Sequence, residues 1–168
     1  NHQKFSGKKI QYFDPETNEN YTPYVVETSI GVDRMVLAVL SHSFKEETLE
    51  NGEKRVVMSI PAPIAPVKAA GLPLVTKDGL PELAQTIMDD LKYDFNCQYE
   101  EKDSIGKRYR RQDAIGTPFC ITVDHESLKD HCVTLRDRDT MQQERVPIEK
   151  LRSIIDEKVN MNNLLRKL

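Results

Sequence analysis

The sequence predicts an α/β protein in which a mixed, mostly parallel sheet flanked by helices follows a smaller antiparallel segment. From residue 67 onward, short apolar runs alternate with stretches whose apolar residues recur at helical spacing, which is the βαβ order of a partly parallel sheet. Before residue 60, two strand-like runs flank a connector rich in turn-forming residues. Three prolines within six residues, at 61, 63 and 66, prevent ladder pairing and sustained helix, so we place a domain boundary there.

The first 60 residues are expected to contribute a small antiparallel element and one helix. Residues 9–13 and 21–26 have the composition of strands, and the sequence DPETNEN between them is typical of a turn. Two strands and one helix bury too little apolar surface to be stable alone. We therefore expect residues 1–60 to be the tail of a larger antiparallel domain whose remaining part lies upstream.

A helix is predicted directly after Gly31. Residues 35–40 (MVLAVL) are apolar on nearly every side, which is typical of a buried helix. Asp33 suits the N-cap, which would leave Arg34 at the first helical position. The polar residues 45–55 are expected to form a surface excursion, and residues 56–60 a last strand.

From residue 67 the expected elements alternate, and Pro81 stands near the first turn of the first helix, as proline often does. Ligands of such sheets usually bind at the carboxyl ends of the strands. In order, we expect a strand at 67–75, a helix ending near 91, a strand at 95–99, a helix at 105–115 capped by Ser104, strands at 118–123, 132–136 and 143–147, and a helix at 148–159.

Composition and charge limit the classes of function. Of the 168 residues 38% are hydrophobic and 30% charged, and the net charge is −3, so a nucleic acid would have to bind a local basic patch. No apolar run is long enough to cross a membrane and none resembles a signal peptide, so we expect no membrane partner and a cytoplasmic location. The cysteines Cys97, Cys120 and Cys132 form no CxxC pair and are expected to be reduced and buried. His125 and Cys132 lack a second pair of ligands, so no metal site is expected.

The stretch from Pro23 to Phe44 carries the clearest chemical signal. It is predicted to be a strand, a tight glycine turn and a helix with Arg34 in its first turn. Free backbone N–H groups and the positive end of the helix dipole would there meet a guanidinium, which is the layout of a phosphate site. By itself, an arginine at a helix start is better explained by pairing with a surface carboxylate.

The residues Glu27-Thr28-Ser29-Ile30-Gly31, followed by Val32-Asp33-Arg34, resemble motif 3 of the class II aminoacyl-tRNA synthetases. Many class II enzymes have Gly-Φ-Gly-Φ-Asp-Arg at this place. Here Ser29 stands where the earlier glycine is usual, and Glu27 precedes it by two residues. This Glu-x-Ser-x-Gly pattern is most similar to the glycyl branch.

A second resemblance covers residues 61 to about 160. It rests on the segments 65–69 (APVKA), 103–119 (DSIGKRYRRQDAIGTPF), 133–139 (VTLRDRD) and 146–148 (VPI). These resemble the class II anticodon-binding domain, which the glycyl, prolyl, threonyl and histidyl enzymes share. The implied organisation is residues 1–60 as the end of a class II catalytic domain and residues 61–168 as the anticodon-binding domain.

The resemblance implies a glycine–tRNA ligase, which activates glycine with ATP and transfers it to tRNA-Gly. It implies ATP as substrate with Mg²⁺, no tightly bound cofactor, and a homodimer for the full-length protein. Arg34 would hold developing phosphate charge as the catalytic residue, with Gly31, Val32 and Asp33 also at ATP. The glycine site would comprise Glu27 for the ammonium group, Ser29 for pocket shape, and the adjacent Thr28, Ile30 and Gly31. Motifs 1 and 2 are absent, so this chain is expected to be inactive alone.

Two basic patches are candidates for tRNA contact. Arg136 and Arg138 follow a predicted strand, and the resemblance favours them for the anticodon. Lys107, Arg108 and Arg111 lie on a predicted helix, where a solvated face paired to nearby aspartates is an equally good interpretation. Two alternatives remain open: a synthetase for proline, threonine or histidine, and a non-catalytic RNA-binding module. Glu27 with Ser29 favours glycine, and an intact set of Glu27, Ser29 and Arg34 favours an enzyme.

Overall fold

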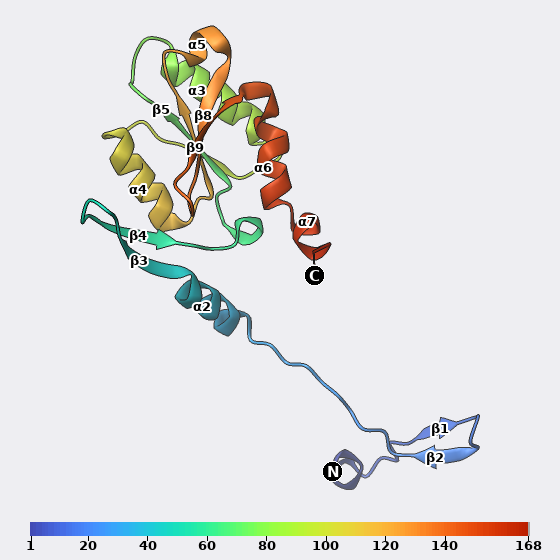
Figure 1. Cartoon of the computed structure of the whole chain (residues 1–168). Helices are drawn as coiled ribbons and strands as arrows, with labels where there is room; N and C mark the ends of the chain where they lie inside the picture. Colours follow the sequence, from blue (N-terminus) through green and yellow to red (C-terminus); the bar gives the residue numbers. More distant parts are fainter. Residues whose placement is uncertain (168) are drawn as a thin grey trace. The chain divides into compact units, whose positions relative to one another are not determined.

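The computed structural model describes residues 1–167 and contains two compact units. The N-terminal unit is Asn1–Met35, and the C-terminal unit begins at Val36 (Figure 1). The division falls inside helix α2, Val32–Ser43. Each unit is described below by itself.

The N-terminal unit contains a short helix and a hairpin. Helix α1 is His2–Ser6, and strands β1 (Tyr12–Asp14) and β2 (Glu19–Tyr21) pair antiparallel. The rings of Tyr12 and Tyr21 meet edge to face at 5.7 Å between centroids. The predicted pair of strands is thus confirmed in shorter form. The extension of the second strand to Val26 is wrong: residues 22–31 have no regular structure, because no strand described here lies beside them to accept their hydrogen bonds.

Helix α2 follows Gly31 as predicted, but two details differ. The helix begins at Val32, and the amide of Met35 donates to the Gly31 carbonyl at 3.0 Å, so Asp33 lies within the first turn and is not the N-cap. The prediction of a buried helix is also wrong, since Met35 and Leu37 are exposed by 51% and 65%. No side chain of α2 belongs to an apolar core among residues 1–167, so its apolar faces stay exposed.

The polar segment 45–55 lies largely at the surface, as expected, but it is part of a β-hairpin that the sequence did not indicate. Strands β3 (Phe44–Thr48) and β4 (Lys54–Met58) pair antiparallel along five residues each. In β4 the side chains of Arg55 and Val57 are buried and their neighbours are partly or fully exposed. The burial pattern has the period of two expected of a strand, so the strand predicted at 56–60 is present but begins two residues earlier. Its start was placed too late because Arg55 occupies an inward position.

The central sheet of the C-terminal unit has five strands in the order β6-β5-β7-β8-β9. Strand β5 is parallel to β6 and β7, whereas β8 is antiparallel to β7 and β9 is antiparallel to β8. The mixed α/β sheet is therefore confirmed. The strands are β5 (Ala69–Pro73), β6 (Cys97–Tyr99), β7 (Phe119–Val123), β8 (Cys132–Asp137) and β9 (Gln143–Pro147).

Helices cover both faces of this sheet. The larger apolar core joins one sheet face to α3 and α6, with Leu80, Ile87 and Ile155 among its members. On the other face Ala70, Leu72 and Cys120 lie under Ile105 and Tyr109 of α4. The helices are α3 (Leu80–Leu91), α4 (Ile105–Ile115), α5 (Ser127–Asp130), α6 (Leu151–Val159) and α7 (Met161–Leu165), with 3-10 turns η1 (Ala62–Ile64) and η2 (Ile148–Lys150).

The hairpin β3–β4 belongs to the same compact unit as the five-stranded sheet. Helix α4 packs against β4, and the carbonyl of Ser43 accepts a bond of 2.7 Å from the amide of Ser59. The boundary expected near residue 60 remains an expectation, but residues 36–60 and the domain that follows form one body in this structure.

Candidate nucleic-acid interface

The motif around Arg34 is exposed in the N-terminal unit. Residues 22–35 are all exposed, and Glu27 and Ser29 lie in the irregular segment. The prediction that these two side chains share one strand face therefore has no strand to support it. Arg34 does lie in the first turn of α2, and its aliphatic stem is close to Gly31, where an added Cβ would be 3.8 Å from Cδ. The arginine and the helix start are thus brought together as predicted.

The five basic candidates of the C-terminal unit divide by exposure. Lys107 and Arg111 are exposed on α4, whereas Arg108, Arg136 and Arg138 are only 2–3% exposed. A buried guanidinium bonded to protein groups has few donors left for a phosphate or a base. The sequence could not show this difference, because Arg108 is buried between Lys107 and Arg111 in the same basic run.

Arg108 closes the carboxyl ends of two parallel strands. Its Nη1 donates to the carbonyl of Pro73 at 2.6 Å and to that of Glu100 at 3.3 Å, and its Nη2 donates to the carbonyl of Leu74 at 3.3 Å. Burial lowers the pKa of this guanidinium. Its Nε is buried without a hydrogen-bond partner among the described residues. Arg108 therefore holds the loops after β5 and β6 against the start of α4.

Arg136 forms a bidentate pair with Asp113 of α4. Nη1 donates to Oδ1 at 2.8 Å and Nη2 donates to Oδ2 at 3.0 Å. The guanidinium lies over the ring of Tyr109, 4.8 Å from its centroid, in cation–π geometry. Burial acts to lower the pKa of Arg136, but the bonds to Asp113 outweigh it and raise the pKa. The side chain is consequently held as a charged group in one position.

Arg138 is also bonded within the protein. Its Nη1 donates to the Gly116 carbonyl at 2.7 Å, and its Nε and Nη2 donate to the two oxygens of Asp139 at 2.9 and 2.8 Å. The end of β8 pairs with the start of β7, Asp137 opposite Phe119. Arg136 and Arg138 thus lie at the edge where the parallel strands begin, not at their carboxyl ends. That part of our argument for these arginines is wrong, because β8 is antiparallel.

The basic residues of α4 are partly neutralised by carboxylates, as the interpretation of a solvated, paired helix face expected. Arg111 donates to Glu100 and to Asp103, the latter at 2.8 Å. The expected pairing with Asp113 involves Arg110, at a longer 3.8 Å. Lys107 is exposed, and no pairing with a carboxylate is recorded for it in the described part of the chain.

A cleft of about 460 Å³ lies between α4 and the strand pair β8–β9. Gln143 stands directly opposite Arg136 in the ladder, so both side chains lie on the sheet face that α4 only partly covers. Arg110 contacts Glu53 at 3.6 Å across the cleft. Sequence reasoning missed Arg110 and Gln143, and only strand register could have indicated the latter. The lining residues are Glu53, Gly106, Lys107, Tyr109, Arg110, Arg136, Met141 and Gln143.

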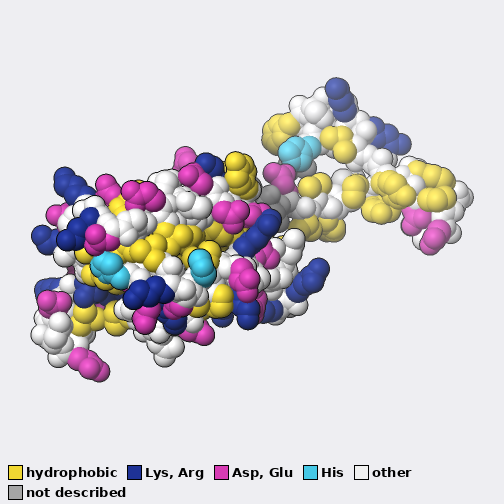
Figure 2. All heavy atoms as spheres, turned by 90° about the horizontal axis from the view of Figure 1, so that it is seen from above, with side chains coloured by type: hydrophobic (Ala, Val, Ile, Leu, Met, Phe, Trp, Pro, Cys, Tyr) yellow, Lys and Arg dark blue, Asp and Glu magenta, His cyan; other side chains and the backbone are white. Residues whose placement is uncertain are grey.

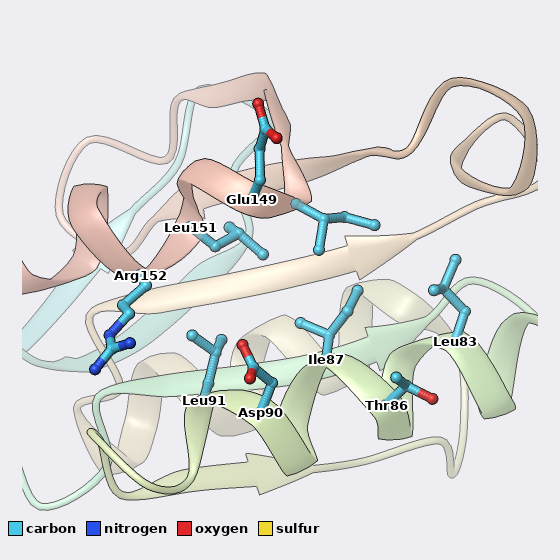
Figure 3. Close-up of a pocket in the computed structure, with 9 residues that line it drawn as sticks. Leu83, Thr86, Ile87, Asp90, Leu91, Glu149, Leu151 and Arg152 are labelled. Carbon is cyan, nitrogen blue, oxygen red and sulfur yellow. The ribbon is translucent and has the colours of Figure 1, made fainter.

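A second cavity of about 500 Å³ lies between α3 and the η2–α6 segment. Ile87 and Leu91 of α3 lie on one side of it and Leu151 on the other, with Leu83 further along α3 (Figure 3). Its arginine, Arg152, is paired with Asp94 at 2.5 Å. An apolar floor with a neutralised cation is poorly suited to a nucleic acid. Charges of both signs are interspersed over the visible surface of the C-terminal unit (Figure 2). The cleft beside α4 has three basic lining residues and one acidic one.

The thiols agree with the expected burial only in part. Cys120 is buried, and burial raises its pKa to about 12, whereas Cys97 and Cys132 are half-buried. Burial also raises the pKa of Cys97 to about 11. Residues 1–167 contain no cluster of three metal-ligating side chains, and none of their helices has the length and apolar character needed to cross a membrane.

Comparison with known proteins identifies the family of the C-terminal unit. Residues 68–158, more than half of the chain, match the family described as "Anticodon binding domain", and the chain belongs to that family. The RNA-binding domain of threonyl-tRNA synthetase from Cryptosporidium parvum superimposes on 60% of the chain with a TM-score of 0.54 at 21% identity. Prolyl-tRNA synthetase from the same organism covers 73% with a TM-score of 0.55 at 17% identity. These two likenesses concern the fold.

The curated relatives are more specific. The chain is 51% identical over 158 residues to a glycine–tRNA ligase of Clostridium acetobutylicum, which covers 94% of this chain and 34% of the relative. It is 54% identical over 159 residues to the corresponding ligase of Clostridium perfringens, with 92% and 34% covered. The chain spans about a third of the length of these relatives.

Proposed function

We propose that this chain is part of a glycine–tRNA ligase and that its C-terminal unit binds the anticodon arm of tRNA-Gly. The observation that carries the proposal is the cleft between α4 and β8–β9, which lies within the matched anticodon-binding region apart from Glu53. Identity above 50% to glycine–tRNA ligases supports glycine over proline, threonine or histidine. The same relatives argue against a non-catalytic module.

In this proposal the cleft holds a single-stranded part of the anticodon loop. Lys107 and Arg110 are the accessible cations at its rim and would contact phosphates. The Gln143 amide offers both a donor and an acceptor to a base edge. Arg136 and Tyr109 form the wall between them. Arg108 and Arg138 support the surrounding loops rather than the RNA.

The motif of the N-terminal unit would serve the activation step. Glu27 would bind the glycine ammonium, with Ser29 and its neighbours shaping the pocket. Because glycine has no side chain to contact, larger amino acids would be excluded sterically. Arg34 would hold the phosphates of ATP, which enters with Mg²⁺ as substrate. The whole enzyme is proposed to act as a homodimer.

The RNA part of the proposal is tested with the 168-residue chain and two stem-loops, one with a glycine anticodon and one with a swapped anticodon. Lys107→Ala should weaken both complexes alike and reduce the salt dependence, as expected for a lost phosphate contact. Gln143→Ala should reduce the preference for the glycine anticodon by about 1–3 kcal/mol. Arg152→Ala, at the other cavity, is the control and should change neither. Equal binding of both stem-loops by the unaltered chain would refute anticodon recognition.

The catalytic part is tested in the full-length ligase by exchange between ATP and pyrophosphate. Arg34→Ala should slow the exchange by roughly two orders of magnitude, the loss typical of removing one charge-stabilising group. Glu27→Gln should weaken glycine more than ATP, because an amide lacks the charge that pairs with an ammonium group. The 168-residue chain alone should show no exchange. Normal exchange in the Arg34 variant would show that this arginine is structural.

A further inference from the structure

Asp113 of α4 is a buried carboxylate that accepts hydrogen bonds from side chains of β4 and β8. It is fully buried in the last turn of α4. Both of its oxygens accept from Arg136 of β8, and Oδ2 also accepts from Nε of Arg55 on β4 at 2.9 Å. The two arginines are themselves almost completely buried. One carboxylate therefore fixes a cleft arginine and the β3–β4 hairpin together.

Arg55 has a partner for each of its nitrogens. Nη1 donates to Glu47 of β3 at 2.8 Å, and Nη2 donates to the backbone carbonyl of Arg138. Arg55 thus contacts the carboxylate that holds Arg136 and the chain two residues beyond it. It does not line the cleft, so any effect it has there passes through Asp113 and β8.

The chain after α4 approaches the end of β4 closely at Gly116. Gly116 follows α4 with φ of +88°, and a Cβ at this position would lie 2.8 Å from the carbonyl oxygen of Met58 at the end of β4. Ser59, one residue later, donates from Oγ to Asp139 at 2.9 Å. Only glycine permits both the left-handed conformation and this contact. The hairpin is therefore seated against the same end of the sheet that carries Arg136.

We infer that Asp113 is a positioning residue for anticodon recognition and that the β3–β4 hairpin, which lies outside the matched residues 68–158, is a working part of the RNA-binding unit. The inference rests on the proposed function. With Arg55 in place, the carboxylate has donors on both sides, which set its plane and thereby the position of Arg136 over Tyr109. Without Arg55, Oδ2 keeps one donor, and the carboxylate and Arg136 can turn together. The wall of the cleft beside Gln143 then loses its fixed geometry.

The test uses the 168-residue chain with Arg55→Met, which removes the charge but keeps an apolar stem. Arg152→Met, an exposed arginine paired with Asp94 at the other cavity, is the matched control. Binding of the glycine-anticodon and swapped stem-loops is measured across a range of salt concentrations. We expect the ratio of the two affinities to shrink by about tenfold in Arg55→Met, the low end of what one base contact contributes. The salt slope should stay unchanged, because no phosphate contact is removed.

A second pair of variants covers the case in which Arg55→Met does not fold. Gly116→Ala forces the hairpin away from α4 without touching a charge. Gly71→Ala, whose Cβ would crowd Met88 of α3 and which does not line the cleft, is its control. Glu47→Gln loosens Arg55 while leaving Asp113 intact. If the folded variants keep the affinity ratio of the unaltered chain, the inference is overturned. An equal loss of affinity for both stem-loops also overturns it, because the hairpin would then stabilise the domain without affecting anticodon preference. If the unaltered chain does not distinguish the stem-loops, the proposed function itself fails first.

Discussion

Replacing Asp113 by asparagine should destabilise the C-terminal unit severely. The change keeps the shape of the side chain but removes the charge that faces Arg55 and Arg136. Three charge-assisted bonds of 2.8–3.0 Å are affected, and at about 1.5–3 kcal/mol each they set an upper limit of roughly 4–9 kcal/mol. Arg55 retains Glu47 and the Arg138 carbonyl, so we expect a loss of about 3–5 kcal/mol, the usual cost of leaving buried charges unpaired.

The assay is urea unfolding of the 168-residue chain, followed by far-ultraviolet circular dichroism. With a slope of about 1–3 kcal/mol per molar urea, the expected loss lowers the midpoint by more than roughly 1 M. Asp103→Asn is the matched control, since Asp103 pairs with Arg111 beside the same helix but is exposed. Its effect should be about 0–1 kcal/mol. The reasoning is refuted if the two variants differ by less than about 0.5 kcal/mol, the spread of ordinary surface substitutions.

Three further predictions concern acid stability, thiol reactivity and packing. Burial acts to raise the pKa of Asp124, but hydrogen bonds from Arg145 and Ser127 hold that pKa below its usual range. The carboxylate therefore stabilises the fold fully above about pH 4, and this stabilisation is lost as the pH falls through the pKa of Asp124 in the folded protein. Asp124→Asn should make the free energy of unfolding fall less steeply in acid. Cys120, whose pKa burial raises to about 12, should be alkylated at pH 8 only as fast as the unit unfolds. In Gly71→Ala the new Cβ would lie 2.6 Å from Cγ of Met88, which should cost about 1–3 kcal/mol by overpacking.

Each of these predictions has a comparison within the same chain. The free energies of unfolding of the unaltered protein and of Asp124→Asn, measured at a series of pH values, should converge in acid. A constant difference across the pH range would contradict the stabilising role of the Asp124 carboxylate. Cys132, half-buried at the start of β8, should be alkylated before Cys120 in the folded protein. Gly106→Ala should leave the unfolding midpoint within about 0.5 kcal/mol of the unaltered protein. A similar midpoint for Gly71→Ala would show that Met88 moves aside without cost.

Most elements from residue 67 onward were predicted from local sequence, but the short helices α5 and α7 were not. Apolar residues at helical spacing predicted α3 and α6, and short runs of strand-favouring residues between turn-forming residues predicted the five strands. These patterns are local because each element buries one face against a common core. The helix start beside Arg34 was predicted for a different reason: a glycine followed by a helix start is a local signal, set by neighbouring residues.

Which basic residues stay accessible was decided by tertiary structure alone. Arg136 lies at the end of a predicted strand, and we expected it beside the carboxyl ends of the parallel strands. Because β8 is antiparallel, Arg136 lies where the parallel strands begin, bonded to Asp113. Strand direction depends on how the chain returns to the sheet, which residues within a strand do not encode. Arg108 and Arg111 are three residues apart on one helix, yet the first is buried beneath loops and the second is largely exposed.

The hairpin β3–β4 illustrates the limit most clearly. Its sequence is polar, and one inward position of β4 is an arginine. An inward arginine is stable only when a buried carboxylate meets it. That carboxylate, Asp113, is 58 residues further along the chain. Local composition therefore determined the order of the strands and helices, whereas the pairing of charges distant in sequence determined how the hairpin, α4 and β8 are joined. The physical reason is that burial of a charge depends on its partner, and the partner is brought near only by the complete fold.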